Sequence, residues 1–326
     1  MIQMFLFFIA SMSCVLRVGV CQSLSGELVP SGTMSMDLRR ALGSYGITEF
    51  DNLESIKSLV LDHKKIEDLS GISLFRNLEN LDLSDNQITD IRELRNLNVT
   101  MLSLENNHIH DISPLCQIEN LEFLLLGANK IEEASAIKCC SNLKHLSLYD
   151  NSISDFLFLS GLTKLQVIDL SGNQIRDIAP LRHLKNLEVV LLNKNYIEKI
   201  NALSCLKNLS RVDVSSNQVH DLAPLSNLHN LNSIDVSSNQ VRDLAPLSNL
   251  ESIDVVNAAT NSITDIGPLV RNSGLSYPSA LTHIIESVFI GTVLIDTVDV
   301  SGNPLDATSV SVYIPMLRKR GVEVVF

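Results

Sequence analysis

The sequence lacks the short motifs that identify many enzymes and nucleotide-binding proteins. It has no G-x-G-x-x-G or G-x-x-x-x-G-K-[ST] phosphate loop, no H-E-x-x-H zinc pair and no G-x-S-x-G nucleophile turn. Tryptophan is absent, and 37 acidic residues outnumber 25 Lys and Arg, which gives a net charge of −12. Because phosphate contacts need cationic side chains, this charge argues against nucleic-acid binding. A negative net charge is otherwise typical of a protein with a solvated surface.

Cysteine spacing excludes further kinds of site. None of the six cysteines shows the C-x-x-C spacing of a zinc or redox site, and no short disulfide framework is apparent. The adjacent Cys139 and Cys140 cannot easily pair with each other. Cys140 falls on a core position of the repeat described below, so we expect a buried free thiol. We expect no metal ion and no cofactor.

Apolar runs long enough to cross a membrane are also missing. Residues 2–16 read IQMFLFFIASMSCVL, which is too short for an ordinary span but suits the core of a signal peptide. No Lys or Arg precedes this run, and residues 18–21 loosely resemble a lipoprotein cleavage site. We expect a signal peptide over 1–23 and a secreted or cell-surface protein. An uncleaved membrane anchor, a lipoprotein, or no targeting role at all are the alternatives.

What the chain contains is a 22-residue repeat. Residues 165–186 read LQVIDLSGNQIRDIAPLRHLKN, which has the form L-x-x-L-x-L-x-x-N-x-I-x-D-I-x-P-L-x-x-L-x-x. This spacing is the leucine-rich-repeat signature. Copies begin at Ile56, Leu78, Val99, Leu121, Leu143, Leu165, Leu187, Leu209, Leu231, Ile253 and Ile295.

The apolar positions within one repeat predict its local structure. Positions 4 and 6 alternate, as in a strand, whereas the later apolar positions recur every three residues, as in a 3₁₀ return path. We therefore expect an α/β solenoid, the leucine-rich-repeat horseshoe. It should have about eleven short parallel strands on its concave face, a 3₁₀ or irregular convex side, a helical N-terminal cap and a helix–strand C-terminal cap.

Two polar positions are expected to be structural. Position 9 is Asn in ten repeats and Lys64 in the first, and Asn both donates and accepts hydrogen bonds and can satisfy stacked turns of backbone. Position 13 is usually Asp, which can cap the amides that open a helical turn. A ladder of metal-binding carboxylates is the alternative for position 13. The asparagines are Asn86, Asn107, Asn129, Asn151, Asn173, Asn195, Asn217, Asn239, Asn261 and Asn303.

The expected boundaries follow from where the repeat begins and breaks. They are a signal peptide at 1–23, a linker at 24–34, a helical cap at 35–55, repeats at 56–275, an insertion or degenerate repeat at 276–294, and the last repeat with its cap at 295–326.

These residues resemble a known family. The 22-residue form with I-x-D-I-x-P-L is similar to internalin-like secreted bacterial proteins and to the leucine-rich regulatory subunit of type-one protein phosphatase. The flanking segments, GITEFDNLESIKSLVL at 46–61 and the ending at 302–326, look more like the bacterial proteins. The resemblance implies protein binding on the concave face and names no partner.

Positions 3, 5 and 7 should form that concave face. In the fourth to seventh repeats they carry apolar residues on consecutive strands, and contiguous exposed apolar area often marks an interaction site. Acidic residues flank this patch, which would suit a basic-rimmed protein partner. The candidate partner-binding residues are Phe123, Leu125, His145, Tyr149, Val167, Asp169, Val189, Leu191, Arg211, Asp213 and Asp235.

Structural explanations remain open for both features. The apolar residues could reflect β-propensity on a partly shielded face, or cover by a terminus or a second copy of the chain. The acidic residues could reflect the L-D-L-S segment that is common in this type of repeat. His108, His110 and His145 come with no nucleophile signature, so they are expected to be ordinary surface residues. Asn98 and Asn208 fit the glycosylation sequon.

The sequence therefore predicts a non-catalytic protein-binding module, secreted or at the cell surface. Its partner is another protein, with no nucleic acid and no small-molecule substrate, and a membrane is contacted only through an uncleaved N-terminal segment. The alternative is an intracellular scaffold, cytoplasmic or nuclear, that regulates a type-one protein phosphatase.

Overall fold

The computed structural model describes residues 34–44, 53–275 and 296–326. The expected signal peptide at 1–23 and the expected insertion at 276–294 lie outside these ranges, as does the expected linker up to residue 33. The chain forms two compact units, Met1–Ile153 and Ser154–Phe326. In the described ranges, no helix is both long and apolar enough to span a bilayer.

The first unit consists of short strands and short helical segments that alternate along the chain. Its strands are β1 (Ser58–Val60), β2 (Asn80–Asp82), β3 (Met101–Ser103), β4 (Phe123–Leu125) and β5 (His145–Ser147). Its helical segments are α2 (Met36–Gly43) and the 3₁₀ turns η1 (Leu53–Ser55), η2 (Ile72–Leu74), η3 (Arg92–Leu94), η4 (Ser113–Gln117) and η5 (Ser135–Cys139).

The second unit follows the same plan. Its strands are β6 (Val167–Asp169), β7 (Val189–Leu191), β8 (Arg211–Asp213), β9 (Ser233–Asp235), β10 (Val255–Asn257), β11 (Thr297–Asp299) and β12 (Glu323–Val325). The helical segments are the 3₁₀ turns η6 (Leu157–Gly161), η7 (Ala179–His183), η8 (Asn201–Cys205), η9 (Ala223–Leu225) and η10 (Ala245–Leu247), then α3 (Gly267–Arg271), the π-helical turn η11 (Ser309–Tyr313) and α5 (Ile314–Lys319).

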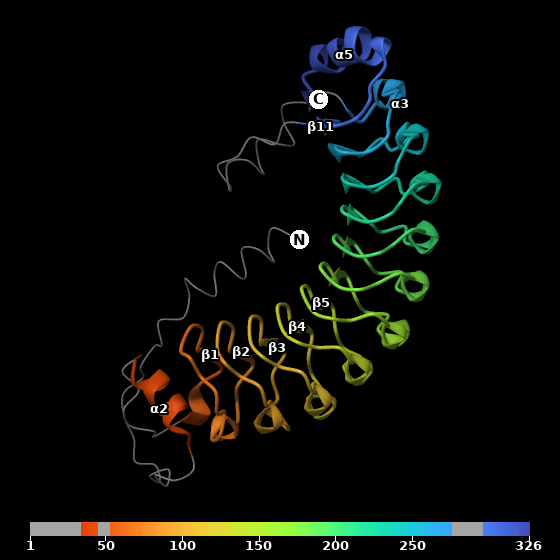
Figure 1. Cartoon of the computed structure of the whole chain (residues 1–326). Helices are drawn as coiled ribbons and strands as arrows, with labels where there is room; N and C mark the ends of the chain where they lie inside the picture. The colour runs from red at the N-terminus through yellow and green to blue at the C-terminus, as the bar shows by residue number, and fades with distance from the viewer. Residues whose placement is uncertain (1–33, 45–52, 276–295) are drawn as a thin grey trace. The chain divides into compact units, whose positions relative to one another are not determined.

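Within each unit the strands line one side of the coil and the 3₁₀ turns line the other (Figure 1). The strands are parallel, and neighbours in the sheet are neighbours in the sequence. Equivalent repeat positions pair across the sheet, as Leu81 does with Leu102 and Leu102 with Leu124. These side chains are 0% exposed, so each strand buries its central residue between the two sides of the coil. The predicted solenoid of parallel strands and 3₁₀ return segments is confirmed.

The asparagine at position 9 closes each turn of backbone. Asn195 donates from Nδ2 to the carbonyls of Leu170 (3.0 Å) and Leu192 (3.0 Å), and its Oδ1 accepts from the backbone N–H of Ile175 (2.9 Å). Each such Asn therefore bonds groups of its own repeat and of the preceding one. Buried backbone groups need partners, and one amide side chain supplies several at once.

The residue before this asparagine has a left-handed backbone. Position 8 has φ between 47° and 68° in every repeat described, from His63 to Gly302. Gly, Asn and Asp occupy several of these positions, but Thr260 adopts φ of 54° with a β-branched side chain. The sharp turn thus recurs with little regard to the residue that makes it.

Asp at position 13 caps the return segment as predicted. Asp177 Oδ1 accepts from the backbone N–H of Ala179 at 2.8 Å, and Asp155 does the same for Leu157 at 2.9 Å. No group of three or more His, Cys, Asp or Glu in the described ranges is arranged to hold a metal ion. The hydrogen bonds to these backbone amides give the aspartates at position 13 a structural role.

The ends of the repeat array carry helices. Ser35 caps α2 by accepting from the backbone N–H of Leu38, and Asp37 on that helix accepts from the backbone N–H groups of Glu67 and Asp68. The hydrogen bond from the backbone N–H of Glu67 is the main reason that the pKa of Asp37 is lowered. At the other end, Asp306 accepts from the N–H of Ser309 at the start of the π-helical turn. Pro315 lies in the first turn of α5, which follows the π-helical turn without a gap, so the C-terminal helical segment continues through the proline.

A disulfide joins Cys116 on η4 to Cys139 on η5. We expected no short disulfide framework from the cysteine spacing, and for this pair that prediction was wrong. The two residues are 23 apart, close to one repeat length, so they lie on adjacent turns of the coil. Cys140 is buried and free, as predicted, and burial raises the pKa of its thiol to about 11. Cys205 is free and exposed.

Replacing Asn195 by Ala should lower the free energy of unfolding by about 3 kcal/mol, because it leaves buried backbone groups without partners. Asn208, an exposed asparagine that donates to the carbonyl of Lys185, gives a matched control. Its replacement by Ala should cost less than about 1 kcal/mol. Urea titration followed by circular dichroism measures both, and equal costs would contradict the structural role of the buried ladder.

The cysteines should differ in reactivity. Under native, non-reducing conditions iodoacetamide should modify Cys205 and leave Cys140 unmodified until the chain is unfolded, because the thiolate is the reactive form and Cys140 is buried. Peptide mapping by mass spectrometry should recover Cys116 and Cys139 as one cross-linked pair. Recovery of both as free thiols from an oxidised sample would refute the pairing.

Candidate functional site

In the first unit, the strand face carries a compact group of rings. Phe123 on β4 and His145 on β5 are register partners, and their rings stack with centroids 4.6 Å apart. Leu125 lies beside them, between Ser103 and Ser147 on the neighbouring strands. The structure therefore brings together the first-unit residues proposed from the sequence.

Tyr149 lies two residues beyond the end of β5, and a glycine makes its position possible. A Cβ atom built on Gly127 would lie 2.1 Å from Cε1 of Tyr149, so any larger residue at 127 would displace the ring. Gly127 occupies position 7 of its repeat, directly preceding Tyr149 in the same column. Gly127 was not among the predicted site residues, although the lack of a side chain there beside a tyrosine in the next repeat was the available signal.

Burial on this face is deeper than the sequence suggested. Leu125 is 3% exposed and His145 is 8% exposed, whereas Phe123 and Tyr149 are half-buried. Burial, and secondarily the charge of Lys144, lowers the pKa of His145 from 6.5 to about 4. His145 is therefore neutral at physiological pH, and the expectation of an ordinary surface histidine was wrong. His108 and His110 are exposed, as expected.

In the second unit, apolar residues occupy the strand face of β6 and β7. Val167 pairs with Val189, and Asp169 pairs with Leu191. Val189 is 2% exposed, and Val167 and Leu191 are half-buried. The next strand places the exposed Arg211 beside Val189 and Asp213 beside Leu191. The second-unit residues proposed from the sequence thus adjoin one another on one face.

The aspartates of this face have a local role. In Asp169, Asp213 and Asp235, Oδ1 accepts both the backbone N–H and the hydroxyl of the serine two residues later, at 2.6–2.9 Å. This clasp closes the end of each strand and gives a structural reason for the recurrent L-D-L-S and V-D-V-S segments. The acidic residues are therefore held rigidly, whether or not a partner contacts them.

Two of these aspartates also share a register. Asp213 faces Asp235 across adjacent strands, and Nδ2 of Asn257 donates to Oδ2 of Asp235 at 2.7 Å. Burial is the main cause that raises the pKa of Asp213, and the charge of Asp235 adds to it. A depression of about 300 Å³ lies over this part of the sheet and is lined by Arg211, Asp235, Asn257, Thr297 and Asp299 among others. A basic group placed there would relieve the repulsion between the carboxylates.

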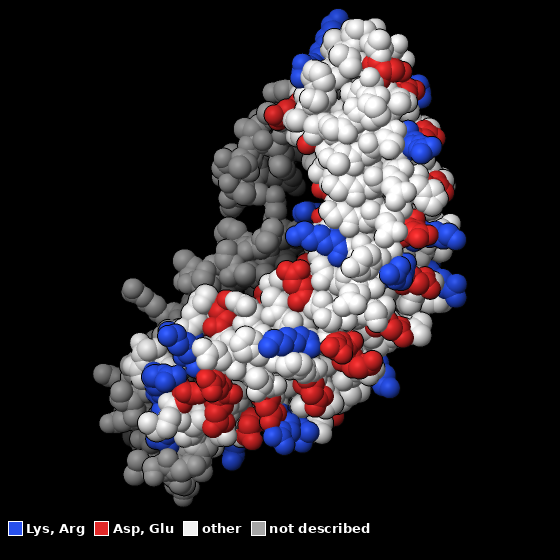
Figure 2. All heavy atoms as spheres, in the orientation of Figure 1, with Lys and Arg blue, Asp and Glu red and all other residues white. Residues whose placement is uncertain are grey.

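On one side of the molecule, charges of both signs are mixed (Figure 2). On the side that Figure 2 shows, basic side chains lie among acidic ones, and a strip without formal charge runs along the second unit. Such mixing is typical of a solvated protein surface.

Stability should depend on pH through His145. The unfolded chain binds a proton at this residue near pH 6.5, whereas the folded chain does so only near pH 4. This contribution is therefore complete above about pH 6.5 and is lost as the pH falls toward 4, with a slope of up to about 1.4 kcal/mol per pH unit. His145→Phe, which keeps a ring next to Phe123, should reduce the slope of the unfolding free energy between pH 4.5 and about 6.5. The same change at the exposed His220 should leave that slope unaltered, and equal slopes in all three proteins would rule out the assignment.

Comparison with known proteins agrees with this geometry. A family model described as "Leucine Rich repeats (2 copies)" matches residues 141–183 and 207–249, and one described as "Leucine Rich repeat" matches 76–91. No curated protein sequence matches significantly.

Solved structures with the same fold come from bacteria and plants. An internalin from Listeria monocytogenes is 25% identical with a TM-score of 0.70, and the match covers 93% of this chain and 99% of the internalin. Internalin C2 of the same organism is 26% identical with a TM-score of 0.55, covering 73% and 100%. The leucine-rich-repeat ectodomain of the Arabidopsis thaliana receptor kinase GASSHO1/SCHENGEN3, in complex with CASPARIAN STRIP INTEGRITY FACTOR 2, is 21% identical with a TM-score of 0.63, covering 82% and 35%.

The last likeness concerns the fold alone. Leucine-rich-repeat folds are typically non-catalytic and serve as modules that bind proteins. From its repeats, its parallel strands and these matches, the chain is a leucine-rich-repeat protein that structurally resembles the internalins of Listeria monocytogenes.

Proposed function

We propose that this protein is an exported binding module that holds a protein partner against its strand face. The single observation that carries the proposal is the apolar character of outward strand positions that the repeat itself does not require to be apolar. The same columns hold Asn80, Asp82 and Ser233 in other repeats, and the fold is unchanged there. The core does not need Phe123, Val167 or Leu191 at these positions, so a contact outside the core is a reason for them.

The chemistry of the face suggests how a partner would bind. Rigid side chains give contact area at little entropic cost, and a few buried anchor residues contribute most of the binding energy in protein interfaces. The stacked rings of Phe123 and His145 offer one anchor in the first unit, and Leu191 beside Val189 offers another in the second. The acidic residues Asp213 and Asp235 favour a partner with basic residues next to its apolar contact.

Export is supported by the disulfide. A bond between Cys116 and Cys139 persists in oxidising compartments and is rare in the cytosol. This chemistry favours a secreted or cell-surface protein over the intracellular phosphatase scaffold, which stays a prediction from the resemblance. The likeness to internalins, over 93% of this chain in one case, is consistent with the same choice.

Binding should be lost when a charge is placed on the strand face. The purified full-length chain is immobilised, proteins from the host cell surface and medium are captured, and the affinity of each captured protein is measured for wild type and variants. Leu191→Asp and Phe123→Asp should each weaken binding at least about tenfold, because an interface would bury an unpaired carboxylate. Leu125 is a poorer probe, because it is 3% exposed and an Asp there would disturb the packing.

The matched control is Asn201→Asp. It introduces the same charge in the repeat of Leu191 but on η8, at the opposite side of the coil, and it should leave binding unchanged. Circular dichroism should be the same for all four proteins. Partners that bind the Leu191 and Phe123 variants as tightly as wild type would exclude the strand face as the binding site.

A further inference from the structure

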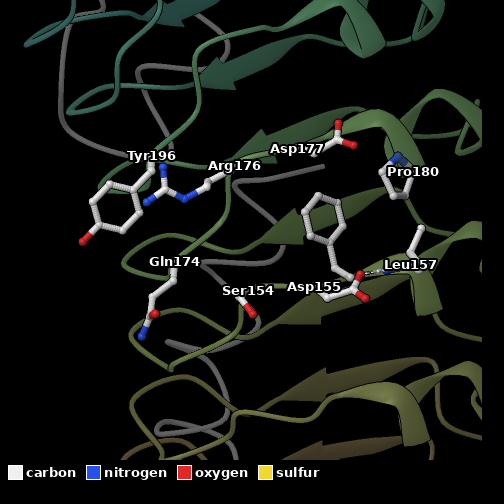
Figure 3. Close-up of a pocket in the computed structure, with 9 residues that line it drawn as sticks. Ser154, Asp155, Leu157, Gln174, Arg176, Asp177, Pro180 and Tyr196 are labelled. Carbon is white, nitrogen blue, oxygen red and sulfur yellow. Dashed lines mark hydrogen bonds between the residues drawn. The ribbon is translucent and has the colours of Figure 1, made fainter.

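A second surface in the second unit lies away from the strand face. We propose that a depression on its flank, the flank pocket, binds an extended segment of a protein partner in which a basic residue stands next to an aliphatic one. The flank pocket has a volume of about 410 Å³, and its main lining residues are Asp155, Leu157, Arg176, Asp177, Pro180 and Tyr196. In Figure 3, Tyr196 and Arg176 lie together on one side, and Asp177, Pro180 and Leu157 lie on the other.

Leu157 departs from the pattern of its repeat position. Leu157 is 67% exposed, whereas other repeats place a small or polar residue at this position, position 15. The equivalent residues are Ser70, Arg92, Ser113, Ser135, Ala179, Asn201, Ala223, Ala245 and Gly267. Since the coil forms equally well with serine or alanine there, the fold does not require a leucine at 157.

Tyr196, two repeats further along the chain, also departs from the residue type that is usual at its repeat position. Position 10 is polar in the other repeats up to Ser262 and is Pro304 in the last one, whereas Tyr196 is 46% exposed. The equivalent residues are Lys65, Gln87, His108, Lys130, Ser152, Gln174, Gln218, Gln240 and Ser262. Phe156, which is 1% exposed, and the buried Pro180 add apolar surface to the lining of the same pocket. Two exceptional apolar residues thus border the same depression.

Charges decide what kind of segment fits. The guanidinium of Arg176 lies over the Tyr196 ring, 5.1 Å from its centroid, which fixes both side chains on one side of the pocket. Asp155 and Asp177 use Oδ1 to cap backbone amides. Within the described residues, their Oδ2 atoms accept no hydrogen bond, and both carboxylates are exposed. Two carboxylates against one guanidinium leave the pocket negative, in a chain with a net charge of −12, so a cationic group is the complement.

The occupant is therefore a peptide segment whose aliphatic side chain packs on Leu157 and Pro180 and whose Lys or Arg reaches Asp155 and Asp177. The pocket is open to solvent, because most of its lining residues are exposed. An open depression can admit an extended backbone, whereas small-molecule sites usually enclose most of their ligand. Because the lining residues belong to positions 10 to 16, a segment bound here leaves the strand positions of the same repeats uncovered.

A phage-displayed library of random linear peptides tests the proposal on the full-length chain. The selection is made on wild type and counter-selected on the double variant Leu157→Ser, Tyr196→Gln. These substitutions install residues that neighbouring repeats carry at the same positions, so the fold should be retained. Enriched peptides should combine Lys or Arg with an adjacent leucine, isoleucine or valine. Affinity of the synthetic peptides should fall about tenfold for Leu157→Ser, the loss expected when one aliphatic contact is removed.

The charge assignment has its own variants. Asp155→Asn and Asp177→Asn keep an oxygen that can cap the same amide, and together they should weaken the peptides about tenfold and reduce the salt dependence of binding. Leu191→Asp on the strand face should leave these peptides bound, which separates this proposal from the one above. Enrichment of acidic peptides, enrichment that ignores Leu157 and Tyr196, or no enrichment over the double variant would overturn it.

Discussion

The hydrogen bonding of one asparagine per repeat is the constraint on which the rest of the molecule depends. The turn at positions 8 and 9 directs backbone groups into the core, where water cannot reach them. Asn195 satisfies carbonyls of two successive repeats and an amide of the earlier one, so no repeat is complete without the repeat that follows it. This dependence explains why the chain tolerates Thr260 or Lys194 at a left-handed position but keeps asparagine next to it.

Because a fixed set of repeat positions supplies the core packing and its hydrogen bonds, residues at the other positions can vary without altering the fold. Position 5, for example, holds Leu191 in one repeat and Asp213 in the next, and the two residues are register partners. The fold can therefore be identified from the repeat positions that hold the core and the asparagines. Because the other positions vary without changing the fold, the fold itself contains no information about the ligand. Information about ligands lies in departures from the repeat, as at Phe123, Leu157 and Tyr196.

The sequence was sufficient for the strands, the 3₁₀ return segments, the buried asparagines and the capping aspartates, because each follows from a spacing within one repeat. Features that join neighbouring repeats were harder to predict. The disulfide between Cys116 and Cys139 needed the recognition that residues 23 apart lie on adjacent turns. The environment of Tyr149 depends on the glycine one repeat earlier, and the shift at His145 depends on burial that no local pattern shows.

The candidate site illustrates the same division. Grouping of Phe123, Leu125 and His145 could be predicted, because equivalent positions must adjoin in a parallel sheet. Their exposure could not, and Leu125 is better suited to holding the rings than to contacting a partner. The aspartates have the opposite ambiguity, since a clasp to the following serine fixes them for structural reasons and also holds their carboxylates on the strand face. A partner with basic residues would therefore use groups that are rigid before it arrives, which lowers the entropic cost of binding.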